Sequence, residues 1–213
     1  MSSSTRSRTP DVRAGTLAAA LIAAMAASAE PAAAQPVRAT SATQPAAMTP
    51  SPHITRYVSD GRLAGEGRLT WLGFHVYDAR LYAAPQFDVA DPFAQPFVLE
   101  LTYARKLDGK AIAAASRDEI QRLGFGSEDQ QRRWLAQMEK LFPDVDKGSR
   151  IAGVHQPGGA ARFYVDGAFA GSIDEPEFGR AFFSIWLDPR TRAPRLRDSL
   201  LKPAGPSAGL ASR

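Results

Sequence analysis

The chain has 213 residues, of which 26 are Lys or Arg, 22 are Asp or Glu and none is Cys, so its formal net charge is +4. The lack of cysteine excludes disulfides, thiol nucleophiles and thiolate metal sites. The basic residues are spread along the chain instead of forming a stripe with aromatic residues, which argues against a nucleic-acid-binding protein.

The first 34 residues have the pattern of a secretion signal. An arginine-containing start precedes the apolar run 16–29, and small residues end at Ala34. The run is shorter than the roughly 20 apolar residues that a membrane helix needs. We therefore expect a signal peptide over 1–34, cut after Ala34 or, as the second candidate, after Ala29, with no membrane span left after processing. The mature protein is then expected in the periplasm or outside the cell.

The rest of the chain is expected to hold one folded domain. Residues 35–51 are rich in Pro, Ala, Thr and Ser and are predicted to be a flexible lead-in. Residues 52–203 follow, roughly 150 residues that suffice for a hydrophobic core. Residues 204–213 are predicted to be a disordered tail.

Strand patterns begin the domain. Segment 53–58 and the longer segment 69–83 are rich in β-branched and aromatic residues, and an Asp60-Gly61 turn lies between them. Segment 97–104 has the same character. Each of the three segments is predicted to be a strand.

Two helices are predicted next, over 110–123 and 127–142. Ser127 and Gln130 form a capping box at the start of the second helix, where each side chain satisfies a free backbone donor. Pro143 ends that helix, because proline cannot continue the backbone hydrogen-bond pattern.

Strands return after the helices. Segment 150–155 is followed by a hairpin over 161–173, whose Asp-Gly dipeptide suits a type I′ turn. Asp174 is expected to cap a helix over 175–187, and a short terminal helix follows near Pro194. This order of elements predicts an α+β fold with helices on one face of an antiparallel sheet.

Four stretches carry a resemblance to a known family, namely 65–82, 142–145, 163–167 and 185–189. On these residues the chain resembles the bacterial, exported branch of the chalcone isomerase-like family, over nearly all of 61–201. The resemblance implies an open-faced β-sandwich, in which a large antiparallel sheet is packed by a layer of helices. It also implies a ligand cleft between sheet and helices.

The resemblance also suggests site residues. Arg68 matches the arginine that stabilises negative charge in the plant enzymes, and it could bind a carboxylate, as the family's fatty-acid-binding members do. Tyr77 stands where the enzymes have a threonine, and strict alternation places His75 on the same strand face as Tyr77. The enzymes' tyrosine and a second threonine fall on Ala114 and Ile185, so we predict no catalytic residue. For Arg68 the alternative is an ion pair with a carboxylate of its own or a neighbouring strand.

Three functions remain open from the sequence. The first is an exported protein that binds a fatty acid or similar amphipathic anion without cyclising chalcones. The second is an enzyme of the intramolecular lyase (isomerase) class, and the third is an envelope accessory protein that acts through a partner surface, its partner unspecified. No cofactor is predicted. No metal site is predicted either, because the three histidines lie far apart in the sequence.

Overall fold

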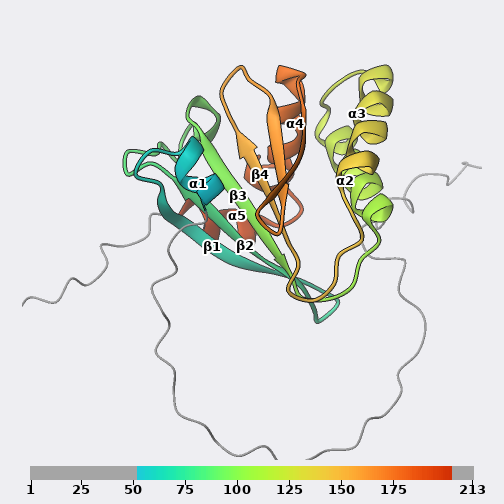
Figure 1. Cartoon of the computed structure of the whole chain (residues 1–213), viewed down its shortest axis with the longest axis horizontal. Coiled ribbons are helices and arrows are strands. Elements are labelled where there is room, and N and C mark those ends of the chain that lie inside the picture. The colour runs from blue at the N-terminus through green and yellow to red at the C-terminus, as the bar shows by residue number, and fades with distance from the viewer. Residues whose placement is uncertain (1–51, 203–213) are drawn as a thin grey trace, which may run out of the picture.

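The structure is a computed structural model that describes residues 52–202. The predicted signal peptide, lead-in and tail lie outside the described residues. The described chain forms one sheet of six antiparallel strands in sequence order, each paired with the next (Figure 1). The strands are β1 (Arg62–Trp71), β2 (Phe74–Ala83), β3 (Phe97–Tyr103), β4 (Arg150–His155), β5 (Ala161–Val165) and β6 (Ala168–Ile173).

Helices cover the two faces of this sheet unequally. The larger layer consists of α2 (Gly109–Leu123), α3 (Glu128–Leu141), α4 (Pro176–Leu187) and α5 (Pro194–Leu201). Helix α2 packs against α3 and α4, and α5 packs against β1 and β2. The short helix α1 (Pro52–Tyr57) lies on the other face, and a 3₁₀ turn, η1 (Pro92–Ala94), stands in the β2–β3 connection. This arrangement confirms the predicted α+β fold, with its main helix layer on one face of an antiparallel sheet.

Two hydrophobic clusters lie on the two faces. The main core fills the space between the sheet and α2–α5, and aromatic rings make up much of it: Phe97, Trp134, Phe142, Phe163, Phe178, Phe182, Phe183 and Trp186. The smaller cluster lies under α1, where Ile54 and Val58 pack near Tyr82, Val98 and Val154.

The predicted strand over 53–58 is a helix instead. Ile54 and Val58 are four residues apart and both are buried, which is the spacing of one helix face. The β-branched composition suggested a strand, but burial of this helical stripe against the outer face of the sheet determines the conformation.

The predicted long strand over 69–83 is in fact the end of β1, a two-residue turn and β2. Leu72 and Gly73 form the turn, with φ angles of 47° and 83°. Two positive φ angles are the signature of a type I′ turn, which usually has Asn or Asp before the glycine. The leucine in the first position hid the turn from sequence reasoning.

Other local predictions are confirmed. The capping box of Ser127 and Gln130 is present at the start of α3. Asp166 and Gly167, with φ angles of 48° and 88°, make the type I′ turn between β5 and β6. The predicted cap by Asp174 is wrong, because α4 begins after Glu175 with Pro176 in its first turn and without a side-chain cap.

None of the helices in residues 52–202 combines the length and the apolar character required to cross a bilayer.

Candidate functional site

The interface between the sheet and α4 contains one buried polar pair. Tyr77 on β2 is 7% exposed, and its hydroxyl accepts a hydrogen bond of 2.9 Å from Nε1 of Trp186 on α4. The ring of Tyr103 meets that of Tyr77 edge-on at 6.0 Å. Burial raises the pKa of both tyrosines well above the ordinary value, so both phenols stay neutral. Tyr77 is therefore a hydrogen-bonding group inside an apolar layer.

Little empty space remains around this pair. The void between sheet and α4 measures about 20 Å³, and it is lined by Leu99, Leu101, Ile151, Gly153, Phe163, Phe182, Phe183 and Trp186. That volume is on the scale of a single water molecule. A guest between the sheet and α4 would require the aromatic side chains to move apart.

Arg68 lies outside this layer. Its side chain is 61% exposed, and its Nε donates a 2.9 Å hydrogen bond to Oδ1 of Asp78, the residue opposite on β2. Because Asp78 follows Tyr77 directly in the strand, Arg68 and Tyr77 lie on opposite faces of the sheet. Partial burial tends to raise the pKa of Asp78, but the hydrogen bond from Arg68 and the nearby His75 hold it below its ordinary value. The arrangement is the ion pair named above as the alternative for Arg68.

His75 does not share a face with Tyr77, and a β-bulge is the reason. Tyr77 pairs with Leu69 but His75 pairs with Thr70, so Val76 is an extra residue in β2. Val76 and Tyr77 are consequently both buried in the main core. His75 is turned the other way, and its Nε2 lies 3.2 Å from Oδ1 of Asp78. The three predicted ligand-binding residues thus separate into Tyr77 inside and Arg68 with His75 outside.

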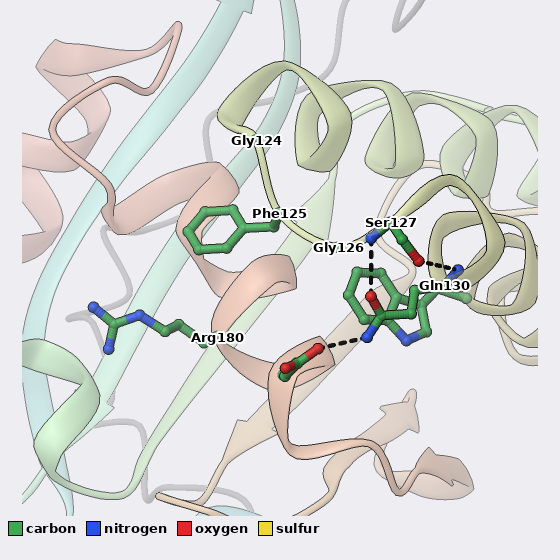
Figure 2. A pocket seen from close by; sticks show the side chains of 8 residues that line it. Gly124, Phe125, Gly126, Ser127, Gln130 and Arg180 are labelled. Atoms are coloured by element: carbon green, nitrogen blue, oxygen red, sulfur yellow. Dashed lines mark hydrogen bonds between the residues drawn. The ribbon is translucent and has the colours of Figure 1, made fainter.

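A larger pocket opens where the α2–α3 connection meets the start of α4 (Figure 2). Its volume is about 420 Å³, and its lining residues are Gly124, Phe125, Gly126, Ser127, Gln130, Trp134, Glu177 and Arg180. Gly124 and Gly126 have positive φ angles of 83° and 71°, which make the connection tight. The capping box that starts α3 forms part of the wall, and Nε2 of Gln130 also donates a hydrogen bond to Oε2 of Glu177.

Arg180 and Trp134 give this pocket its polar character. The guanidinium carbon of Arg180 stands 4.9 Å from the centre of the Phe93 ring, and no carboxylate of residues 52–202 forms an ion pair with it. Trp134 is 1% exposed, and its indole N–H has no hydrogen-bond acceptor among the described residues. The pocket lining therefore combines the cation of Arg180, the aromatic rings of Phe125 and Trp134 and the carboxylate of Glu177, which is already hydrogen-bonded to Gln130.

The sequence signals for this pocket were present but not specific. The sequence Gly124-Phe125-Gly126 predicts a turn before the Ser127 capping box. Arg180 lies within the segment that is predicted to be a helix over 175–187. Only the tertiary packing of α4 beside the α2–α3 connection brings them together.

A buried carboxylate elsewhere is fully engaged. Glu119 on α2 has a side chain 8% exposed, with Oε2 2.8 Å from Arg122 and Oε1 3.1 Å from Arg192. Both of its oxygens carry an ion pair, so Glu119 has a structural role and is poorly placed to accept a proton from a substrate. Within residues 52–202 there is no group of three or more His, Asp or Glu arranged to hold a metal ion.

The comparisons with known proteins agree with this architecture. A protein from Haemophilus influenzae, described as uncharacterized, is 28% identical over 137 residues, which cover 64% of this chain and 66% of that protein's length. Among solved structures, a fatty-acid binding protein of Arabidopsis thaliana superposes with a TM-score of 0.51 at 16% identity, over 67% of this chain and 87% of that one. At this identity the similarity shows the fold alone. The family model described as chalcone isomerase-like matches residues 58–202, and the chain therefore belongs to the chalcone isomerase-like family.

Proposed function

We propose that the protein binds a fatty acid or a similar amphipathic anion and does not cyclise chalcones. The observation on which this proposal rests is the pocket at Arg180, a cation that forms no ion pair within residues 52–202 and that lines the pocket together with the aromatic rings of Phe125 and Trp134. The pocket volume of about 420 Å³ lies within the range of small-molecule sites. The Arabidopsis protein of the same fold is described as a fatty-acid binding protein, which supports the same class of ligand.

The residues at the positions that match the catalytic residues of the family's enzymes support a binding role. The positions that matched the enzymes' tyrosine and second threonine are Ala114 and Ile185, which carry no polar group. Tyr77 is neutral and hydrogen-bonded to Trp186, and Glu119 is held by two arginines. Cyclisation requires a phenolate to be oriented against an enone while an enolate is stabilised, and these residues do not supply that arrangement.

Two arginines compete for the ligand carboxylate in this proposal. Arg68 is the candidate from the family resemblance, and Arg180 is the candidate from the pocket. Arg68 already pairs with Asp78, so a ligand there would have to share or displace that carboxylate. Arg180 has no such competitor among residues 52–202, and we therefore favour it.

Oleate titration of the wild type and of arginine variants tests the proposal. Arg180→Ala should weaken oleate binding by about tenfold or more, because a charged hydrogen bond contributes roughly 1.5–3 kcal/mol. Arg180→Lys should restore part of the loss, since lysine keeps the charge without the planar fork. The matched control is Arg132→Ala on α3, where the arginine is 69% exposed and pairs with Asp129 outside the pocket.

Each outcome of this titration is informative. A loss of affinity in Arg68→Ala with none in Arg180→Ala would move the carboxylate to the β1–β2 hairpin. No oleate binding by the folded wild type would contradict the proposal, and flavanone formation from a chalcone would contradict its non-catalytic part.

A further inference from the structure

The turn between β1 and β2 exposes an unusual set of apolar side chains. Trp71 is 38% exposed, Leu72 is 80% exposed and Phe74 is 59% exposed. These are three of the five large apolar residues exposed in residues 52–202, and they stand within four positions of one another. The turn lies at the lower end of the sheet in Figure 1, where β1 and β2 end. A contiguous apolar tip of this kind marks an interaction surface.

The backbone conformation of the turn does not explain why a leucine occupies position 72. The β5–β6 turn has almost the same conformation, and its first residue is Asp166, a residue type that tolerates a positive φ angle. A leucine at φ 47° is disfavoured by contact of its Cβ with the backbone. With 80% exposure, Leu72 does not gain burial in return. Neither turn formation nor core packing accounts for this side chain.

The loop after β3 brings basic residues to one side of the apolar tip. The guanidinium carbon of Arg105, in the loop after β3, stands 5.4 Å from the centre of the Phe74 ring. Arg68 is already paired with Asp78, so the cations beside the tip that form no ion pair within residues 52–202 are Arg105 and Lys106. The nearest further acids are Asp108 and Asp146, which lie on either side of the Leu107–Val145 bridge. The tip therefore has an apolar end and a positively charged flank.

We propose that this tip inserts into the interfacial region of a membrane that contains anionic lipid. Tryptophan, phenylalanine and leucine side chains at a projecting turn can reach the boundary between lipid headgroups and acyl chains. Amphipathic rings and aliphatic side chains are bound favourably at that depth. Arg105 and Lys106 then lie at the level of anionic headgroups, to which basic residues near a membrane surface are attracted. A protein partner would instead need a deep pocket for a narrow convex tip, and the flanking charge favours the lipid. This inference is independent of the proposed ligand.

Tryptophan fluorescence offers a direct test, because only one of the three tryptophans is exposed. Trp134 and Trp186 are 1% and 7% exposed, so a change on adding vesicles reports on Trp71. The probe is a vesicle of phosphatidylethanolamine and phosphatidylglycerol with brominated acyl chains, added to protein that begins at Gln35, so that the apolar run 16–29 does not itself enter the lipid. We expect a blue shift and quenching, which weaken in pure phosphatidylcholine and at high salt. Trp71→Phe should abolish both changes.

Variants of the tip separate membrane contact from folding. Leu72→Asn should reduce vesicle affinity by about tenfold or more, which corresponds to loss of one buried leucine side chain. The same change should leave the melting temperature unchanged or higher, because asparagine suits the turn. Phe74→Ser should also reduce affinity, whereas Phe169→Ser should not, although both phenylalanines are 59% exposed. Phe169 is on β6, the opposite edge strand.

Two results would overturn the proposal. If Trp71 shows no vesicle-dependent change in the wild type, the tip does not enter lipid, and a protein partner becomes the better explanation. If Leu72→Asn and Phe74→Ser bind vesicles as tightly as the wild type, another surface is responsible for any binding.

Discussion

Trp186 connects the helix layer to the sheet at the scale of single side chains. It is 7% exposed, packs against Phe182 and donates its indole hydrogen bond to Tyr77. Trp186→Ala should lower the free energy of unfolding by about 3–5 kcal/mol, the usual cost of emptying a buried aromatic site. Trp186→Phe should cost less, about 1–2 kcal/mol, because it keeps a ring and loses mainly the hydrogen bond.

Urea denaturation followed by circular dichroism measures both changes. Tyr77→Phe serves as the partner variant, since it removes the acceptor and leaves the indole donor in place. If Trp186→Ala changes the free energy of unfolding by less than about 1 kcal/mol, the side chain does not belong to the core.

His155 is a buried histidine whose protonation should affect stability. It is 5% exposed, and its Nε2–H donates to the carbonyl oxygen of Phe93 at 3.1 Å, because a carbonyl only accepts. Burial lowers the pKa of His155, although the hydrogen bond to Phe93 opposes this shift, and the nearby positive charge of Arg180 lowers the pKa further. The folded protein therefore disfavours the charged ring.

The direction of the pH dependence follows from that lowered pKa. In the unfolded chain the ring takes up a proton near its ordinary pKa of about 6.5, whereas the folded protein does so only at a lower pH. The stability that the neutral ring contributes is fully present above the unfolded pKa of about 6.5. It is lost as the pH falls from there through the folded pKa. The melting temperature of the wild type should thus fall more between about pH 7.5 and 5.5 than that of His155→Gln, which keeps a donor for Phe93. Equal losses in both proteins would show that His155 does not control this range.

At the scale of elements, two glycines determine how closely α5 approaches β1. A Cβ on Gly65 would lie 2.1 Å from the carbonyl oxygen of Leu200, and one on Gly67 would lie 2.7 Å from Cδ1 of Leu196. Gly65→Ala should therefore lower the free energy of unfolding by about 3 kcal/mol, because neither backbone can move without disturbing its neighbours. Gly159→Ala is the matched control, since its nearest heavy atoms would lie 3.4 and 3.5 Å away. A similar small effect for both variants would mean that α5 moves aside at little cost.

The predicted elements were correct where the signals were local. The capping box of Ser127, the Asp166-Gly167 turn and the helix over 175–187 depend on neighbours a few residues away, and the structure confirms each of them. The turn at Leu72 was missed because leucine is a rare residue at that backbone conformation. The strand predicted at 53–58 failed because burial against a distant sheet face outweighed the local composition.

The candidate site was less accessible to sequence reasoning. One extra residue at Val76 moved His75 to the face opposite Tyr77, and alternation cannot reveal a bulge. Arg68 was chosen by resemblance, which does not specify that Asp78 stands opposite it. The pocket at Arg180 joins residues more than 50 positions apart, from the α2–α3 connection to α4, so its existence depends on tertiary packing.

At the scale of the whole molecule, processing is the prediction that concerns the N-terminal residues. The secreted form should begin near Gln35, because the small residues of the expected cleavage site end at Ala34. N-terminal sequencing of the protein isolated from its own host measures this directly. A product that is bound to the membrane and still begins at Met1 would contradict the predicted location.

The contact between α5 and β1 also sets the order in which the domain can be completed. Gly65 and Gly67 present no side chain toward α5, and the backbone of Ser199 and Leu200 with the side chains of Leu196 and Ser199 fills the space. The face of β1 at these glycines is therefore covered only when α5 has formed and docked. A chain in which this helix has not yet docked leaves that face of β1, an edge strand of the sheet, open to solvent and to other chains. The domain is therefore complete only once Pro194–Leu201 has folded onto β1.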